Sequence, residues 1–326
     1  MESTTTQLSV NGKSVSVPSV RIDNRNVVVT GKGLKSAWIH DEDFQPQATL
    51  SDPAAFIASL KARGLKADIF TFSQKFTDAE PHFPYPFVME NVAAIPTENY
   101  SAWWEGLPQE TRKNVRRAAK RGVTIRAVEF DDALVRGIKD IYDELPIRQG
   151  RKFWHYGKDL ETIKRENATY LESSQFVGAF CGEELIGFLK MVYVDDAARI
   201  MQILSKNAHF DKRPANAMLT AAVEICSKRG IKHFIYGKYI YDNKKNSPVT
   251  EFKRRHGFLE LSFPKYYAPL TMKGALMVRT KLHLGVRRLL PESMVTYLLN
   301  VRSRFYERNS AKGKETKTPE AGNVPA

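Results

Sequence analysis

The sequence predicts an α/β protein, of the α+β type, in which helices flank a mixed β-sheet. From residue 124 onward, strand-like and helix-like segments follow one another in the order β-α-α-β-β-β-α-β-α-β. A meander followed by two alternating βα units places helices on the faces of a mixed sheet. Residues 1–99 form a smaller α+β unit, residues 100–272 the main domain, and residues 273–308 two basic amphipathic helices.

The composition is that of a folded protein. The chain has 326 residues, of which 42% are hydrophobic and 26% are charged, which excludes a chain disordered throughout. The two cysteines, Cys181 and Cys226, exclude a disulfide scaffold and a zinc knuckle. Residues 1–10 lack the pattern of a secretory signal, and no apolar run approaches the roughly 20 residues that span a bilayer. We therefore expect a cytoplasmic protein.

Positive charge is concentrated in two stretches of the chain. The net charge is +14, from 50 basic and 36 acidic side chains. Residues 112–121 hold six basic residues and no acid, and residues 273–314 hold ten basic residues against Glu292 and Glu307. These stretches favour a phosphate-bearing partner, nucleic acid or an anionic membrane surface. The alternative is that they are solvated helix faces.

The N-terminal unit is predicted from turn signals and alternation. Residues 1–20 are rich in Ser, Thr and Val and are expected to be poorly ordered. We expect strands at 27–30, 34–40, 67–76 and 87–95, and one helix that Asp52 and Pro53 begin and that ends at residue 62.

The main domain is predicted to begin with two short helices, at 100–107 and 111–121, and the second carries the first basic stretch. Gly122 follows that helix in a position typical of a C-cap. Strands are expected at 124–130, 176–181, 184–194, 198–205, 231–239 and 258–267, and helices at 133–145, 159–172, 214–229 and 248–256.

Three segments carry a resemblance to a known family. They are the basic helix in 107–123, the helix, turn and strand of 221–237, and the segment 251–258, in which Phe252 and Lys253 precede Gly257 and Phe258. In this order they resemble the GNAT acyltransferase superfamily, specifically its Fem-type (FemAB-like) branch. The resemblance implies a transferase that moves an acyl or aminoacyl group from acyl-CoA or aminoacyl-tRNA to an amine, on an envelope precursor or a sugar. It also implies that residues 1–99 are a degenerate second GNAT-like half.

The resemblance implies a donor site between two strands that splay apart, here 198–205 and 231–239. Backbone N–H groups of the first strand, which ends at Ser205, would polarise the acyl carbonyl. The N-terminus of the next helix would face donor phosphates, with Lys212, Arg213 and Asn216 beside it. The turn 211–217 lacks the glycines of acetyl-CoA users, which argues against acyl-CoA and leaves aminoacyl-tRNA open. A solvated turn is the alternative for the two basic side chains.

The resemblance also supplies catalytic candidates. Lys253 stands where many GNAT enzymes have Tyr and Fem-type proteins have Lys, and its ammonium could stabilise developing negative charge. Tyr239, at the mouth of the splayed strands, could protonate a leaving group, and Lys238 beside it could bind the substrate. His155 titrates near neutrality and could act as a base. The alternatives are a surface lysine, a packed tyrosine and an ordinary loop histidine.

The loop 147–158 is the predicted acceptor site. Arg148 and Arg151 could clamp a carboxylate or a phosphate, and Trp154 and Tyr156 could stack on a sugar or a base. The alternative is a loop whose aromatic side chains pack against the domain. No metal site is expected. No bound cofactor is expected either, since acyl-CoA would be a co-substrate.

The C-terminal segment combines leucines with Arg and Lys on both sides of Pro291. Such helices could lie on the anionic inner face of a membrane, or could dock on the domain with a basic outer face. Residues 309–326 are predicted to be disordered. Two other functions stay open: a non-catalytic tRNA- or nucleic-acid-binding protein on the same fold, and a peripheral membrane protein.

Overall fold

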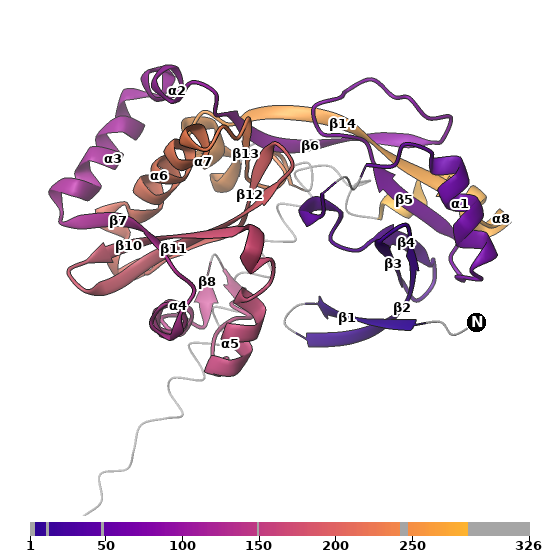
Figure 1. Cartoon of the computed structure of the whole chain (residues 1–326), viewed down its shortest axis with the longest axis horizontal. Coiled ribbons are helices and arrows are strands. Elements are labelled where there is room, and N and C mark those ends of the chain that lie inside the picture. Colours follow the sequence, from indigo (N-terminus) through magenta and orange to yellow (C-terminus); the bar gives the residue numbers. More distant parts are fainter. Residues whose placement is uncertain (1–3, 11–12, 47–48, 149, 242–246, 286–326) are drawn as a thin grey trace, which may run out of the picture.

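One large mixed sheet organises the protein. The computed structural model describes residues 4–10, 13–46, 49–148, 150–241 and 247–285, and in these ranges twelve strands form one sheet with helices on its faces (Figure 1). The order across the sheet is β1-β2-β3-β4-β5-β14-β6-β13-β12-β11-β10-β7. This mixed sheet with flanking helices is the predicted class of fold.

The N-terminal half begins with an antiparallel meander. Its strands are β1 (Thr4–Val10), β2 (Lys13–Ile22), β3 (Arg25–Thr30) and β4 (Ser36–Ile39). After the short helical turn η1 (Glu42–Phe44), helix α1 (Pro53–Ala62) crosses over to β5 (Ile69–Ser73), which pairs parallel with β4. Asp52 caps α1 through the N–H of Ala55, as its position before Pro53 predicts.

The expectation that residues 1–20 are poorly ordered is wrong for the part that the structure describes. Strands β1 and β2 pair along their length, and Leu8 and Val17 are buried against Val28. The alternation of apolar and polar residues in β2 is weak by itself. Strand β2 is ordered because it pairs with β3, which places Val28 of β3 against Val17 of β2.

The C-terminal half contains the predicted succession of elements. Its helices are α2 (Tyr100–Gly106), α3 (Gln109–Lys120), α4 (Asp132–Tyr142), α5 (Leu160–Asn167), α6 (Pro214–Lys228) and α7 (Pro248–Arg255). Its strands are β7 (Val123–Val128), β10 (Ser174–Cys181), β11 (Glu184–Val194), β12 (Ala197–Ser205), β13 (His233–Ile235) and β14 (Leu259–Pro269). The small hairpin of β8 (Ile147–Arg148) and β9 (Arg151–Lys152) lies in the predicted loop.

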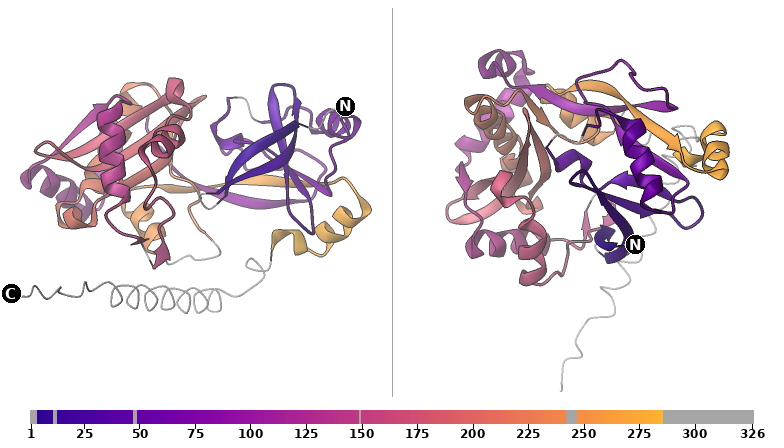
Figure 2. Two further views of the ribbon diagram at one scale, coloured as in Figure 1. Left: turned by 90° about the horizontal axis from the view of Figure 1, so that it is seen from below. Right: turned by 45° about the vertical axis from the view of Figure 1, so that its right-hand side comes forward.

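The sheet has the same topology when followed from either edge. In each half, four antiparallel strands are followed by a helix and then by a strand that pairs parallel with the fourth. The helix is α1 in the first half, where β5 pairs with β4, and α6 in the second half, where β13 pairs with β12. The next strand of each half then crosses to the other half: β6 (Phe87–Pro96) pairs with β13, and β14 pairs with β5 (Figure 2). The N-terminal half therefore repeats the strand topology of the C-terminal half without counterparts of α4, α5 and α7.

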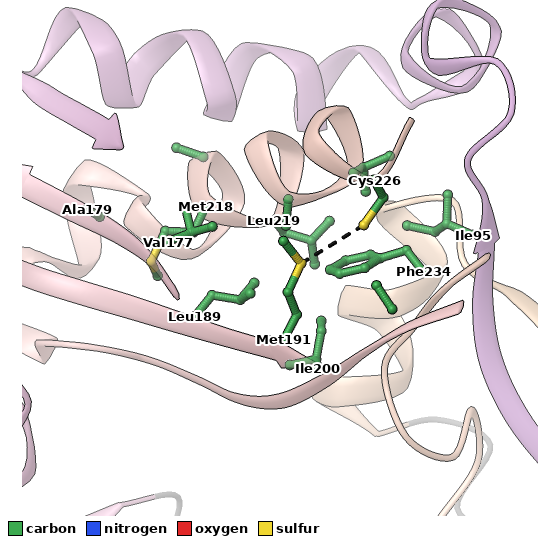
Figure 3. Packing of buried hydrophobic residues seen from close by; sticks show 14 of the residues in the cluster. Ile95, Val177, Ala179, Leu189, Met191, Ile200, Met218, Leu219, Cys226 and Phe234 are labelled. Atoms are coloured by element: carbon green, nitrogen blue, oxygen red, sulfur yellow. Dashed lines mark hydrogen bonds between the residues drawn. The ribbon is translucent and has the colours of Figure 1, made fainter. Parts of the chain in front are cut away.

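The main core of the C-terminal half lies between its strands and α6. Met191, Leu219, Cys226 and Phe234 are fully buried there, and Cys226 Sγ is 4.0 Å from Met191 Sδ (Figure 3). A second cluster lies between the opposite face of the sheet and α4 and α5. Helices α6 and α7 thus lie on one face, and α4 and α5 on the other (Figure 1).

The described chain ends with α8 (Met272–Arg279) and the turn η4 (Leu282–Leu284). The second predicted C-terminal helix and the predicted disordered tail, 309–326, lie outside the described residues. Within the described ranges, no helix combines the length and the apolar character that crossing a bilayer requires.

Candidate functional site

Strands β12 and β13 diverge as expected for a donor site. They pair over only three positions, 197–199 with 233–235. Strand β12 continues to Ser205 along β11, whereas β13 ends at Ile235 and is shorter than the predicted 231–239. The chain turns at Gly237, where φ is +53° and an added Cβ would lie 2.5 Å from Tyr241 Oη. Only glycine allows this turn and this contact without strain.

A cavity of about 420 Å³ lies at the end of β12. Five elements line it: Ser205 on β12; Phe210 on the short helical turn η3 (Asn207–Lys212); Arg213, Pro214, Ala215 and Asn216 at the start of α6; Glu110, Thr111 and Asn114 on α3; and Pro248, Glu251, Phe252, Arg255 and His256 at α7. The cavity therefore brings together three of the four residues predicted to bind the donor, namely Ser205, Arg213 and Asn216.

Within the cavity, the start of α6 is suited to an anion, although Glu110 and Glu251 also line the cavity. No side chain caps α6, whose N-cap residue Arg213 has a left-handed backbone with φ of 59°. The first N–H groups of a helix have no acceptor within the helix, and the helix dipole adds positive potential there. In addition, Arg213 Nε and Asn114 Oδ1 are buried without a hydrogen-bond partner among the described residues. Unsatisfied polar atoms of this kind point to a missing ligand or water.

Lys212, the fourth predicted donor residue, lies outside the cavity. Its Nζ is 2.9 Å from His209 Nδ1 and 3.4 Å from Cys181 Sγ. His209 in turn contacts Glu184 at 3.2 Å. The backbone turn at Arg213 therefore sends two neighbouring basic side chains to different places.

His256 fixes the orientation of Asn216. Its Nδ1 lies 2.7 Å from the carbonyl oxygen of Phe252, and because a carbonyl only accepts, Nδ1 carries the proton. Its Nε2 then accepts from Asn216 Nδ2 at 3.0 Å. Burial lowers the pKa of His256 to about 4, so the ring is neutral at neutral pH. We assigned no role to His256 from the sequence, although it lies inside the segment that carries the resemblance.

Lys253 is fully buried on the other side of α7. Its Nζ donates to the carbonyl oxygen of Lys238 at 2.5 Å and lies 4.5 Å and 4.8 Å from the ring centroids of Tyr236 and Tyr241. Burial lowers the pKa of Lys253 to about 8. The alternative of a surface lysine is therefore wrong, but Lys253 does not line the cavity.

Tyr239 and Lys238 lie in the segment that follows β13. Tyr239 is half-buried against the main core, and its carbonyl oxygen accepts from Thr250 Oγ1 at 3.4 Å. The Nζ of Lys238 pairs with Glu90 on β6. Both residues adjoin Lys253 on the strand-gap side of α7, and neither lines the cavity.

His155 belongs to a buried network on the opposite face of the sheet. Tyr142 Oη donates to Gln202 Oε1 at 2.8 Å, so the Gln202 amide nitrogen faces His155 Nε2 at 3.3 Å and donates to it. His155 Nδ1 is 4.0 Å from Glu166. Burial, assisted by Lys158 and Arg148, lowers the pKa of His155 to about 3. The predicted titration near neutrality is therefore wrong, and the structure does not bring His155 to Lys253.

The predicted acceptor loop divides into buried and open side chains. Arg148 donates to the carbonyl oxygens of Ser205 and Ile141 at 3.0 and 2.7 Å and pairs with Glu144. Its guanidinium thus holds the end of β12 rather than facing solvent. The open members of the loop include Arg151, Trp154 and Tyr156, and the Trp154 ring lies tilted against the His155 ring with the centroids 3.6 Å apart.

The basic stretch of α3 borders the cavity. Helix α3 packs against α6, Thr111 Oγ1 donates to the carbonyl oxygen of Arg255 at 3.0 Å, and Arg121 pairs with Asp211. Lys113, Arg116 and Lys120 are exposed. These basic side chains therefore lie on a helix of the cavity wall but do not themselves line the cavity.

The fold is similar to that of three solved structures. FemX matches with a TM-score of 0.50 and 12% identity over 76% of this chain and 86% of its own. The C-terminal domain (DUF2156) assigned to a lysylphosphatidylglycerol synthetase from Agrobacterium fabrum matches with a TM-score of 0.52 and 13% identity. The match covers 82% of this chain and 89% of that domain. L-PGS from Bacillus licheniformis matches with a TM-score of 0.50 and 14% identity over 79% of this chain and 85% of its own. At these identities the likeness shows the fold alone. No protein-family model and no curated protein sequence matches the chain.

Proposed function

Since the chain has the GNAT fold in the form of its Fem-type branch, we propose that it is an acyltransferase. It would transfer an acyl or aminoacyl group from an activated, phosphate-bearing donor to an amine. The observation that carries the proposal is the cavity where the end of β12, the uncapped start of α6 and Arg213 meet. Fold alone would not assign the reaction, because one fold serves many functions.

In the proposed reaction, donor phosphates bind at the start of α6 with Arg213 and Asn216, and the acyl carbonyl lies along β12 toward Ser205. The acceptor nitrogen attacks the carbonyl carbon, the bond to the donor oxygen or sulfur breaks, and the amine loses a proton. Lys253 lies outside the cavity and beside the strand gap, so in this proposal the acyl end of the donor extends from the cavity into that gap, where the Lys253 ammonium would stabilise the negative charge that develops on the carbonyl oxygen. Tyr239 remains the candidate that protonates the leaving group.

Aminoacyl-tRNA is the donor that the surface around the cavity favours. The exposed basic residues of α3 lie on a helix that lines the cavity with other side chains, and a polyanion larger than acyl-CoA could extend to them. The turn before α6 also has no glycine to let a pyrophosphate approach its backbone.

The open side chains of the loop 147–158 are the proposed acceptor surface. Arg151 could pair with a carboxylate or phosphate, and Trp154 and Tyr156, which are 46% and 47% exposed, could stack on a sugar. An amine on an envelope precursor or a sugar fits this surface. His155 would support the stacking ring of Trp154 rather than act as a base.

Donor binding can be tested with two adjacent variants. Arg213→Gln should weaken the binding of aminoacyl-tRNA roughly tenfold, because it removes a charge-assisted contact in the cavity. Lys212→Gln removes the same charge one residue away, outside the cavity, and should change binding less than twofold. Equal effects of the two variants would refute the assignment of the cavity. Native mass spectrometry of freshly isolated protein would show directly whether aminoacyl-tRNA, CoA or neither copurifies.

A non-catalytic tRNA-binding protein is the second candidate, and the exposed basic face of α3 favours it. Both candidates predict affinity that falls steeply with salt and with neutralisation of Lys113, Arg116 and Lys120. They differ in turnover. Acyl transfer from a bound donor to an amine would exclude the second candidate, and tight tRNA binding without transfer to any amine would exclude the first.

A further inference from the structure

We propose that the outer face of α8 and η4 is a docking surface for an anionic lipid membrane. This docking face consists of Met272, Leu276, Arg279, Lys281 and Leu282. It lies at the opposite end of the molecule from α6 and α7 (Figure 1), so the proposal does not rest on the transferase activity.

Apolar side chains project from this face into solvent. Met272 is 92% exposed, Leu276 61% and Leu282 51%. Met272 and Leu276 are four residues apart on a helix and therefore lie on one face. A single exposed leucine is ordinary on a protein surface, but a group of large apolar side chains marks an interaction site.

The orientation of α8 is fixed by its inner face. Gly274 packs on the backbone of Asp68, where an added Cβ would lie 1.9 Å from the carbonyl oxygen. Thr271 caps the helix and donates to Asp68 Oδ1 at 3.0 Å, and Val278 is buried. Because these contacts hold the inner face, the apolar outer side chains cannot turn inward.

The segment of the chain that carries the docking face has charges of one sign, and Asp68 lies against the inner side of α8. No acidic residue occurs from residue 261 to residue 291, and the six basic residues in this stretch are Lys265, Lys273, Arg279, Lys281, Arg287 and Arg288. Arg279 and Lys281 are exposed beside the apolar side chains. Apolar side chains flanked by basic ones suit the boundary between acidic headgroups and acyl chains. A nucleic acid would match the charge but would leave the apolar side chains facing phosphates.

A cavity of about 670 Å³ in the N-terminal half has further basic residues in its lining. Its basic lining residues are Lys35, Arg63 and Lys66. The loop that walls it is joined to α8, because Lys273 Nζ donates to the carbonyl oxygen of Gly33 at 2.5 Å. The cavity could accept the phosphate of a lipid headgroup while the leucines enter the bilayer.

Vesicle flotation of the full chain tests the proposal. The protein should float with vesicles of phosphatidylcholine and phosphatidylglycerol and not with phosphatidylcholine alone. Replacing Met272, Leu276 and Leu282 together by Ser, or Arg279 and Lys281 together by Gln, should each weaken binding roughly tenfold or more. Matched controls at other sites are Leu259→Ser, which changes a leucine 52% exposed on β14, and the pair Lys228→Gln and Lys232→Gln.

Three results would overturn the proposal. The first is that either docking-face variant binds anionic vesicles as well as the wild type does. The second is that the wild type binds neutral and anionic vesicles equally. The third is that the protein binds no vesicles but binds tRNA in a way that requires Arg279 and Lys281. Circular dichroism of each variant confirms that it is folded. Arg213→Gln should leave flotation unchanged, so failure of the docking face and failure of the donor cavity give different results.

Discussion

At the scale of single residues, burial controls the charge of the groups around the site. Lys253 and Lys190 are both buried, and burial lowers the pKa of each to about 8. The two differ in their contacts. Lys190 Nζ donates to the carbonyl oxygens of Asn167 and Thr169, which lie at and just beyond the end of α5, so it has a structural role. Lys253 contacts only one carbonyl oxygen and two tyrosine rings among its described neighbours, and it lies beside the strand gap.

Lys253→Met should abolish most acyl transfer without abolishing donor binding. Methionine keeps much of the length and removes the charge, so turnover should fall about a hundredfold or more, as for the loss of one oxyanion contact. Lys190→Met is the matched control, since it removes an equally buried lysine away from the gap. Steady-state kinetics on folded protein should show little change in Lys190→Met. Unchanged turnover in Lys253→Met would remove its proposed role.

His256 should make the fold sensitive to acid. The pKa of His256 is about 4 in the folded protein, against an ordinary value of 6.5. Between these values the unfolded chain binds more protons, so the stability that is present above pH 6.5 is lost as the pH falls toward 4. At about 1.4 kcal/mol per unit of pKa difference, the loss is up to about 3 kcal/mol. Urea titrations at pH 7 and pH 4.5 should show a smaller loss in His256→Gln than in the wild type, whereas His82→Gln, at an exposed histidine, should behave like the wild type.

The residues of the site could be predicted only where a motif or a turn specified them. Ser205, Arg213 and Asn216 could be placed together because the end of a strand and the start of the next helix must meet. Lys253 was identified by its motif, but the side of α7 that it occupies depends on how α7 packs. The buried state of His155 depends on Tyr142 and Gln202, which are far from it in sequence. A loop pattern cannot reveal that contact.

At the scale of elements, close contacts at glycines fix the helices and turns. Strand β11 and helix α1 have the predicted bounds, because alternation and caps are local signals. Strand β13 is shorter than predicted because the chain turns at Gly237, where the Tyr241 side chain packs against the backbone. Apolar periodicity does not reveal this contact. Strands β1 and β2 were missed because their order depends on pairing with β3.

Gly274→Ala should loosen α8. The added methyl would overlap the carbonyl oxygen of Asp68, and overpacking of this kind costs roughly 1–3 kcal/mol. Hydrogen exchange should then be faster at the amides of α8 than in the wild type, with the remainder of the sheet unchanged. Gly106→Ala is the control, because an added Cβ there meets nothing within 4 Å. Exchange of α8 at the wild-type rate would show that the contact with Asp68 does not hold the helix.

At the scale of the whole molecule, the exchange of β6 and β14 joins the two halves. Strand β14 lies between β5 and β6, so the single sheet crosses the predicted boundary at residues 99 and 100. The halves also touch away from β6 and β14: Arg199 pairs with Asp43 at 3.0 Å, and Tyr170 donates to Asp41 and stacks on Phe44. The boundary itself stays a prediction, and what the topology adds is that each half completes the sheet of the other.

The two halves should therefore unfold together. Trp38 reports on the N-terminal half and Trp103 on the C-terminal half, so variants that retain only one of them should give the same melting temperature by fluorescence. Residues 100–326 alone should not fold, because without β6 the strands β13 and β14 have no common neighbour. Co-expression with residues 1–99 should restore a folded complex, since each fragment then regains the strand that it lacks. Two separate melting transitions, or a folded 100–326 fragment, would show that the exchanged strands are not needed for either half.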